Sequence, residues 1–236
     1  MIPWRDNIPA RRPPVITLLL IAANVAVFLY QFSLSVDDPV LRQFVVTWGL
    51  VPSRITEGGW AAAWPGMLTA MFLHGGWLHL IGNMWYLWLF GDNVEDVMGP
   101  FRYIVFYLLG GIAAGLAQYA IAPDSNVPMV GASGAIAAVL GAYLLTFWYA
   151  RVATLVIVFY FIQLIELPAV IVLGGWFLMQ LASGVASLGV RTADVGGVAF
   201  WAHIGGFVFG MVAVRLFRKH PPPRPGPIRR YRWTPY

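Results

Sequence analysis

Long apolar runs, rather than any single motif, limit how this chain can fold. The first run, residues 14–32, contains no charged side chain, and a helix needs about 20 apolar residues to cross the hydrocarbon core of a bilayer. Five more runs of this kind follow, at residues 74–90, 101–122, 130–149, 167–185 and 198–217. The sequence therefore predicts an all-α membrane protein with six transmembrane helices.

The composition agrees with this prediction. Hydrophobic residues make up 59% of the chain and charged residues 11%, against about 25% charged residues in soluble domains. The chain has no cysteine, which excludes disulfides and thiol chemistry but does not fix the compartment. Arg11 and Arg12 precede the first run, and no processing site of small residues follows it, so we do not expect a cleavable signal peptide.

Two segments between the runs have a different character. Residues 34–73 mix charged residues with Trp48, Trp60 and Trp64, a composition that suits a first loop lying in the membrane interface, where indole rings are enriched. Residues 152–165 are rich in Val, Ile, Phe and Tyr but are too few for a helical span. We expect an extended or interfacial connector there, with a seventh span as the alternative.

The basic residues predict the orientation of the protein. Six spans place both termini on one side of the membrane, and cytoplasmic flanks are enriched in Lys and Arg. With the N-terminus inside, twelve of the 15 Lys and Arg residues lie inside and three outside. We therefore expect a cytoplasmic N-terminus at 1–13, a membrane domain at 14–217 and a cytoplasmic Pro- and Arg-rich tail at 218–236. This distribution accounts for the net charge of +5 without nucleic acid as a partner.

A serine between glycines opens the fourth run. The sequence Gly131-Ala132-Ser133-Gly134 places the hydroxyl at the start of a helix, where backbone N–H groups lack partners and the helix dipole is positive. An anion forming beside Ser133 would be stabilised there, which is what acyl transfer requires. Taken alone the motif is weak, because small residues are common where membrane helices pack together.

Three further polar residues are expected at the depth of Ser133. His79 and Asn83 are four residues apart in the second run, so they share one helix face. His203 lies near the start of the sixth run, and in this topology the second, fourth and sixth spans all begin on the outside. Ionisable groups inside a span are costly and are functional candidates by default, although a lone histidine or asparagine also serves as a contact between helices.

Small residues predict which spans approach closely. Ser133, Ala137 and Gly141 form a stripe on the fourth span, and Gly206 and Gly210 form another on the sixth. For the two glycines, close packing is the simplest interpretation. Such packing would bring the histidine of the sixth span within hydrogen-bond reach of the serine of the fourth, at ~3 Å.

Together these residues predict a serine–histidine dyad. His203 would take the proton from Ser133, whose oxygen would attack a peptide carbonyl, and water would release the acyl-enzyme. His79, Asn83 and the backbone N–H of Ser133 would donate to the oxyanion. No acidic residue lies in the outer part of a span to orient His203, and Asp194, which precedes the sixth span, is assigned no role. Because water must reach such a site, we expect the spans to surround a polar cavity that opens to the outside.

Three motifs in this order make the chain resemble the rhomboid family of intramembrane serine proteases over residues ~14–217. They are H-x-x-x-N at His79 and Asn83, G-x-S-G around Ser133, and A-H-x-x-G-x-x-x-G from Ala202 to Gly210. The resemblance implies a six-transmembrane-helix rhomboid bundle. It also implies a serine endopeptidase that cleaves single-span transmembrane proteins within or near the membrane, usually after a small residue, and needs no metal or cofactor. The expected partners are these substrates and the lipid bilayer of a prokaryotic cell (inner) membrane.

The resemblance further suggests supporting roles. His74 matches a family histidine near the water-filled cavity, where a solvated or structural role is expected. Glu95, in a G-x-x-x-E-x-x-x-G stretch, matches a residue that ties helix ends and loops together. Substrate entry in the family involves movement of the fifth span relative to the second. Trp85, Trp176 and Phe177 could contribute to that gate, and lipid-facing bulk is an equally good interpretation of all three.

Two positions depart from the family pattern. Many members carry Trp-Arg in the first loop, where this chain has Trp64-Pro65, which puts the polar anchoring of that loop in doubt. Some members place a tyrosine four residues after the nucleophile, stacked on the catalytic histidine. Here that residue is Ala137, so another group must hold the ring.

Three other function classes can be weighed against this one. A non-catalytic relative that binds transmembrane clients is the main alternative, although such proteins usually lose the serine or the histidine. A transporter is disfavoured because no acidic residue lies within a clear span and no inverted repeat is evident. A soluble hydrolase with a G-x-S-x-G elbow is excluded by hydropathy, and Ala135 stands where the second glycine belongs.

Overall fold

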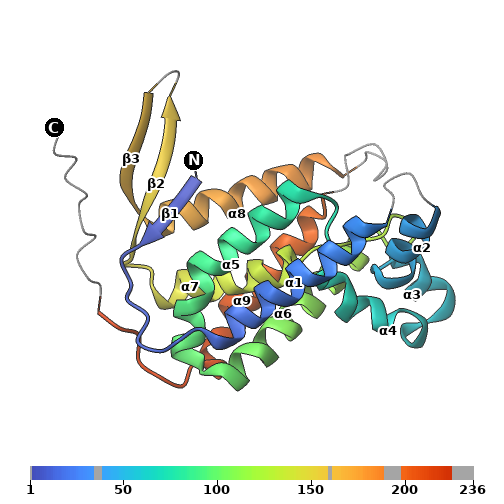
Figure 1. The fold of residues 1–236 in the computed structure, drawn as a ribbon, viewed down its shortest axis with the longest axis horizontal. Coiled ribbons are helices and arrows are strands. Elements are labelled where there is room, and N and C mark those ends of the chain that lie inside the picture. Colours follow the sequence, from blue (N-terminus) through green and yellow to red (C-terminus); the bar gives the residue numbers. More distant parts are fainter. Residues whose placement is uncertain (1, 35–38, 159–160, 189–197, 225–236) are drawn as a thin grey trace.

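The computed structural model describes residues 2–34, 39–158, 161–188 and 198–224. Its elements in chain order are β1 (Ile2–Asp6), α1 (Val15–Ser33), α2 (Pro39–Trp48), α3 (Pro52–Gly58), α4 (Trp60–Thr69), η1 (Ala70–Phe72), α5 (Trp77–Met98), α6 (Pro100–Ile121), α7 (Ser133–Thr146), β2 (Arg151–Val158), β3 (Phe161–Pro168), α8 (Ala169–Ala186) and α9 (Phe200–Phe217). Figure 1 shows a bundle of long helices, with α2, α3 and α4 gathered at one end and the strands at the other.

All six predicted spans are helical and correspond to α1, α5, α6, α7, α8 and α9. By length and hydropathy, four of the described helices, α1, α6, α8 and α9, are able to cross a membrane. Helix α5 has 22 residues, but His79, Asn83 and Asp92 lower its hydropathy, and α7 has only 14 residues. The predicted helical membrane bundle is confirmed, and the protein is an integral membrane protein.

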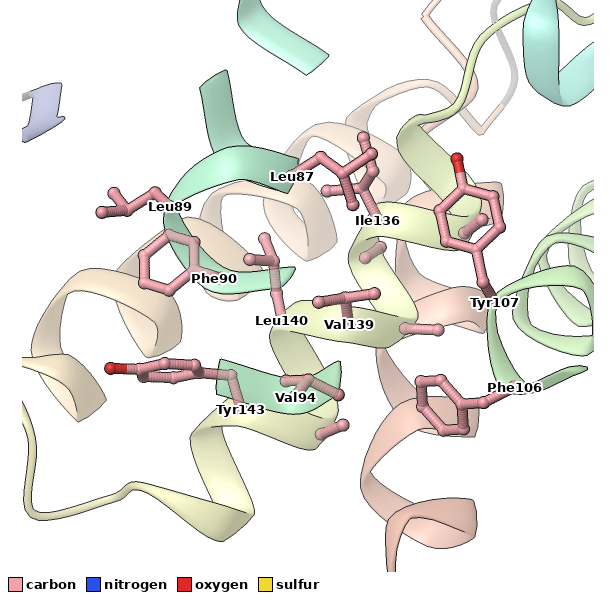
Figure 2. Close-up of a cluster of buried hydrophobic side chains, with 14 of the residues drawn as sticks. Leu87, Leu89, Phe90, Val94, Phe106, Tyr107, Ile136, Val139, Leu140 and Tyr143 are labelled. Atoms are coloured by element: carbon pink, nitrogen blue, oxygen red, sulfur yellow. The ribbon is translucent and has the colours of Figure 1, made fainter. Parts of the chain in front are cut away.

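Helix α7 lies at the centre of the bundle. Every residue from Gly134 to Tyr143 is buried, and the helix packs against α5, α6 and α9. Figure 2 shows the apolar cluster around it, which combines Leu87, Phe90 and Val94 of α5, Phe106 and Tyr107 of α6, and Ile136, Val139, Leu140 and Tyr143 of α7. A helix that is apolar on every side is buried on every side, so α7 is covered by protein where the other spans are partly exposed.

Glycines set the distance between α7 and α9. A Cβ atom on Gly206 would collide with the carbonyl oxygen of Gly134, and one on Gly210 would collide with the carbonyl oxygen of Ala138. On the facing helix, a Cβ on Gly141 would collide with the carbonyl oxygen of Phe207. The space beside these glycines is filled by the backbone of the neighbouring helix, so the predicted close approach of the two small-residue stripes is confirmed.

A three-stranded antiparallel sheet in the order β1-β2-β3 is attached to this bundle. Strands β2 and β3 form a hairpin rich in β-branched residues, which favour strands, so the connector predicted at 152–165 is extended. The alternative of a helical seventh span there is wrong. Strand β1, with Ile2 opposite Leu155, lies in the segment 1–13, for which the sequence predicts only a cytoplasmic terminus. The strand carries no local signal, because its pairing partner is remote in the chain.

The two ends of the described chain meet at one end of the bundle. Arg11 forms an ion pair with Asp96 near the end of α5, at 3.0 Å between Nε and Oδ2. The backbone N–H groups of Lys219 and His220 both donate to the carbonyl oxygen of Val97, at 2.8 Å. Lys219 and His220 follow the last turn of α9, whereas Gly206, which packs on Gly134, lies near the start of that helix. These chain ends and the start of α7 therefore lie toward opposite ends of the bundle. Asp194 and residues 225–236 of the predicted tail lie outside the described residues.

Glu95 fixes the start of α1 in the same region. Its carboxylate accepts hydrogen bonds from the backbone N–H groups of Ile16 and Thr17, at 2.9 and 2.8 Å, and from the Thr17 hydroxyl at 2.8 Å. A carboxylate is favourable at a helix N-terminus because it meets unpaired N–H groups and the positive end of the dipole. The predicted role of Glu95 in tying helix ends together is confirmed.

The first loop is built from α2, α3, α4 and η1. It is joined to the segment that precedes α7 by an antiparallel bridge between Leu50 and Met129, with N···O distances of 3.1 and 2.8 Å. The N–H of Gly131 donates to the carbonyl oxygen of Ala70 at 2.8 Å. The first loop is therefore held against the segment before α7 by backbone pairing at Leu50 and Ala70.

Candidate active site

The hydroxyl of Ser133 and the imidazole of His203 lie in direct contact. Ser133 is the first residue of α7 and His203 lies in the first turn of α9, and the two helices run side by side (Figure 1). The Oγ of Ser133 is 2.7 Å from the Nε2 of His203, so the predicted hydrogen-bond distance is confirmed. Because Ser133 begins its helix, its backbone N–H has no acceptor within α7.

The other side of the His203 ring is held by α8. Its Nδ1 lies 2.8 Å from the Oε1 of Gln180, and the Trp176 ring lies 5.8 Å from the imidazole centroid at an interplanar angle of 38°. These two residues are four apart on one helix face. These two residues therefore hold the imidazole, a role that the small side chain of Ala137 cannot fill.

Gln180 is the site residue that the sequence analysis missed. The available signal was a single amide side chain in the apolar run 167–185, one helical turn after Trp176. A polar residue within a span is a candidate for a buried hydrogen bond, but the sequence does not define which partner it meets.

His79 is placed by a backbone contact and by a glycine. Its Nδ1 accepts a hydrogen bond from the N–H of Gly75 at 3.3 Å, which leaves Nε2 as the protonated nitrogen of the neutral ring. A Cβ atom on Gly131 would lie 2.8 Å from this Nε2 and 3.6 Å from the Ser133 Oγ. Gly131 has a φ of 127°, a conformation that favours glycine, so a larger residue would be both strained and in collision.

Asn83 offers an unused donor beside the serine. Its Nδ2 is buried and has no hydrogen-bond partner among the described residues. Leaving such a donor unpaired costs about 1–3 kcal/mol, and Asn83 lines the same cavity as Ser133. The amide is therefore available to an oxygen atom that enters the cavity.

His74 packs behind His79. Its side chain is 2% exposed, its ring centroid is 5.1 Å from that of His79, and its backbone is held by Gln31, whose Oε1 accepts from the His74 N–H at 3.0 Å. His74 is not among the residues that line the cavity. Of the two roles expected for it, the structural one fits and the solvated one is wrong.

A cavity of about 760 Å³ joins these side chains. It is partly open and is lined by His79, Asn83, Ser133 and His203, with Trp176 of α8 at its wall. The predicted cavity between spans distant in sequence is therefore present and holds the predicted polar side chains, although apolar residues form most of its lining. Its opening toward the outside of the membrane stays a prediction. A second hollow of about 40 Å³ also reaches Ser133 and is lined mostly by glycine, alanine and methionine residues.

The three predicted gate residues have different surroundings. Phe177 stacks on Phe207 of α9, with centroids 4.7 Å apart, and Trp176 lies against His203. Trp85 donates its indole N–H to the carbonyl oxygen of Pro3 at 2.7 Å and is partly covered by β1. None of the three side chains is simply lipid-facing bulk, and their role in a gate remains a prediction.

Comparison with known proteins agrees with the motifs. Residues 61–220 match the model of the Rhomboid domain. The chain is 30% identical over 167 residues to "Rhomboid-like protein 11, chloroplastic" of Arabidopsis thaliana, an alignment covering 67% of this chain and 54% of that protein. It is 34% identical over 131 residues to "Rhomboid protease GluP" and 35% identical over 132 residues to "Putative rhomboid protease YdcA", both of Bacillus subtilis.

These two alignments cover 56% of this chain in each case, and 24% and 61% of the relatives. The chain thus spans about a quarter to three fifths of the curated relatives it matches. Because the domain match extends over most of the chain and includes His79, Asn83, Ser133 and His203, the chain belongs to the Rhomboid family.

Proposed function

We propose that this protein is an intramembrane serine endopeptidase in which Ser133 is the nucleophile and His203 the general base. The observation that carries the proposal is the 2.7 Å contact between the Ser133 Oγ and the His203 Nε2, made at the edge of a cavity that both residues line. A hydroxyl within hydrogen-bond reach of an imidazole is the arrangement that activates serine for acyl transfer.

The reaction follows from the positions of the donors and acceptors. The Ser133 hydroxyl gives its proton to His203 Nε2 as its oxygen bonds to the carbonyl carbon of a peptide. The carbonyl oxygen becomes an oxyanion, and the Ser133 N–H, the Asn83 Nδ2 and the His79 Nε2 are the donors available to it. The C–N bond breaks as His203 protonates the leaving amine, and water repeats the sequence to release the acyl group.

The proposed substrates are single-span transmembrane proteins. The cavity is partly open and is lined by Ser133, and the proposal is that a segment lying in the membrane reaches the serine through this opening. The hollow of about 40 Å³ beside the serine has room for a methyl-sized group, which supports cleavage after a small residue. Sequence that destabilises a helix would favour the reaction, because a helical carbonyl is already hydrogen-bonded to its own chain.

The proposed orientation places residues 1–13 and 218–236 in the cytoplasm and the membrane domain at 14–217, in a prokaryotic cell inner membrane. The meeting of the two chain ends at the end of the bundle opposite Ser133 supports it, as does the excess of Lys and Arg on that side. Exposed indole rings at Trp48, Trp60 and Trp64 support an interfacial position for the first loop.

The full chain, purified in detergent, tests the proposal with a fluorophosphonate probe and a model transmembrane substrate. The wild type should label and cleave, Ser133→Ala should do neither, and His203→Ala should lose cleavage. Ser183→Ala, a serine of α8 outside the cavity, is the matched control and should behave as the wild type. Cleavage that persists in Ser133→Ala would remove the assignment. A wild type that binds the substrate without labelling or cleavage would favour the client-binding alternative.

A further inference from the structure

The imidazole of His203 is held from both sides by different helices. Its Nε2 faces Ser133 of α7, and its Nδ1 faces the Oε1 of Gln180 in α8 at 2.8 Å. Trp176, one turn before Gln180, lies against the ring and also against Phe207 of α9, with centroids 6.0 Å apart. These aromatic contacts between α8 and α9 hold the face of α8 that presents Gln180.

We propose that Gln180 is a positioning residue of the dyad, and that its side-chain carbonyl fixes His203 in the tautomer that carries a proton on Nδ1. This inference rests on the proposed function, since it concerns how His203 acts as a base. A neutral imidazole has one donor nitrogen and one acceptor nitrogen. Only with the proton on Nδ1 does Nε2 present a lone pair to the Ser133 hydroxyl.

No other described residue is hydrogen-bonded to the His203 Nδ1. The described residues also contain no carboxylate ion-paired with this ring, since the ion pair found in them joins Arg11 and Asp96. In serine proteases with a third residue, a carboxylate holds the tautomer and stabilises the imidazolium. Gln180 supplies the first of these functions and not the second.

An amide suits this position physically. A carboxylate within a membrane-spanning helix is costly, whereas a glutamine side chain brings an oxygen acceptor without a charge. Gln180 is half-buried, and its side-chain oxygen reaches the imidazole at 2.8 Å. Loss of the acceptor would free the ring to exchange tautomers and to rotate away from Ser133.

Two substitutions separate positioning from packing. Gln180→Met keeps an unbranched side chain of similar length but removes the oxygen, and Gln180→Glu keeps an oxygen acceptor and adds a charge. Gln118→Met in α6 makes the same chemical change at another buried glutamine and is the matched control. Cleavage of a transmembrane peptide is measured across pH for each variant, with thermal unfolding in parallel.

We expect Gln180→Met to lower kcat by about 10-fold or more, as for loss of a hydrogen bond in a catalytic unit, with KM within about twofold. Gln180→Glu should recover most of kcat and move the acid limb of the kcat profile to higher pH, because a carboxylate stabilises the imidazolium. Gln118→Met should leave the pH profile unchanged. A Gln180→Met variant with wild-type kcat and pH profile, or a folded Gln180→Glu variant without recovery, overturns the inference.

Failure of the proposed function can be told apart from failure of this inference. If the wild type does not cleave, the proposed function fails, and ¹⁵N NMR of histidine-labelled protein in micelles then decides the role of Gln180. The His203 signals, assigned by their absence from His203→Ala, should report a proton on Nδ1 in the wild type and a mixture of tautomers in Gln180→Met. The same tautomer in both proteins overturns the inference.

Discussion

Replacing Gly206 with alanine tests the helix contact that brings the dyad together. A Cβ atom there would lie 3.1 Å from the carbonyl carbon of Gly134 and would collide with the attached oxygen, where ordinary contacts are 3.4–4 Å. Backbone atoms cannot move aside as a side chain does, so α7 and α9 would have to separate by about 1 Å in this close-packed interior. Gly206 follows His203 by three residues and lies one turn away, so the separation acts directly on the 2.7 Å contact with Ser133.

The expected magnitude follows from this displacement. A shift of about 1 Å carries a 2.7 Å hydrogen bond beyond the usual range and costs about 10²-fold in rate when catalytic groups are misplaced. Overpacking also destabilises the folded state by about 1–3 kcal/mol. We expect Gly206→Ala to lower kcat/KM about 10²-fold and to lower the midpoint of thermal unfolding, with the helical content retained.

Cleavage of a fluorogenic transmembrane substrate in micelles measures the first effect, and circular dichroism during heating measures the second. Gly174→Ala and Gly175→Ala in α8 are matched controls, because a Cβ atom at either position meets nothing within 4 Å. Both controls should stay within about twofold of the wild-type rate. Wild-type cleavage and stability in Gly206→Ala would refute the reasoning, and equal losses in the controls would show that the position of the glycine is not the cause.

Three further predictions use other parts of the structure. Asn83→Leu should lower kcat about 10²–10³-fold with little change in KM. It should leave the thermal unfolding midpoint equal or higher, because the buried Nδ2 has no partner among the described residues. Kinetics and melting curves measure the two effects, and a fall in stability without a fall in kcat would contradict the prediction. Burial raises the pKa of Asp6 from 3.8 to about 7, so the folded protein retains a proton that the unfolded chain releases. This stabilisation is complete below pH 3.8 and is lost as pH rises through about 7, so the unfolding midpoint should fall over that range, and a pH series in which Asp6→Asn keeps the wild-type slope would exclude Asp6 as the cause. Glu95→Ala removes the acceptor of three hydrogen bonds at the start of α1 and should cost about 2 kcal/mol or more in unfolding free energy, with KM unchanged.

The bundle and the contact between Ser133 and His203 could be predicted because a membrane restricts the backbone structures that can span it. Each span has to be a helix, and the order of the spans decides which helix ends share a depth. Small residues then select the pair of helices that approach most closely. For Ser133 and His203, 70 residues apart in sequence, these rules were sufficient to predict a contact that the structure gives as 2.7 Å.

The sheet could not be predicted in the same way. Strand β1 gains its stability from pairing with β2, which lies far along the chain, and its five residues carry no local signal for this partner. The same limit applies to the surroundings of Trp85. Its indole N–H donates to Pro3 of β1, so its surroundings depend on an element that the sequence pattern did not indicate.

Gln180 could not be predicted for a different reason. Its helix was expected, but the rotation of α8 about its axis decides whether the amide faces lipid, a neighbouring helix or the cavity. That rotation is set by contacts such as the stacking of Phe177 on Phe207, which concern side chains on two helices at once. A nearly uniform apolar run does not reveal which of its faces makes such contacts.

The length of α7 explains why a polar site can exist inside this membrane domain. Its 14 residues rise about 21 Å, less than the ~30 Å of the hydrocarbon core, so α7 cannot reach from one interface to the other. The N–H groups of its first turn have no hydrogen-bond acceptor within the helix. This first turn then lies below the membrane surface. Unpaired backbone is tolerated at that depth only where protein or water surrounds it, and the cavity of about 760 Å³ reaches Ser133 there. The φ of 127° at Gly131 keeps the helix from starting earlier in the chain. A change that extended α7 toward its N-terminus through Gly131 would pair those N–H groups and remove the donors on which the proposed chemistry depends.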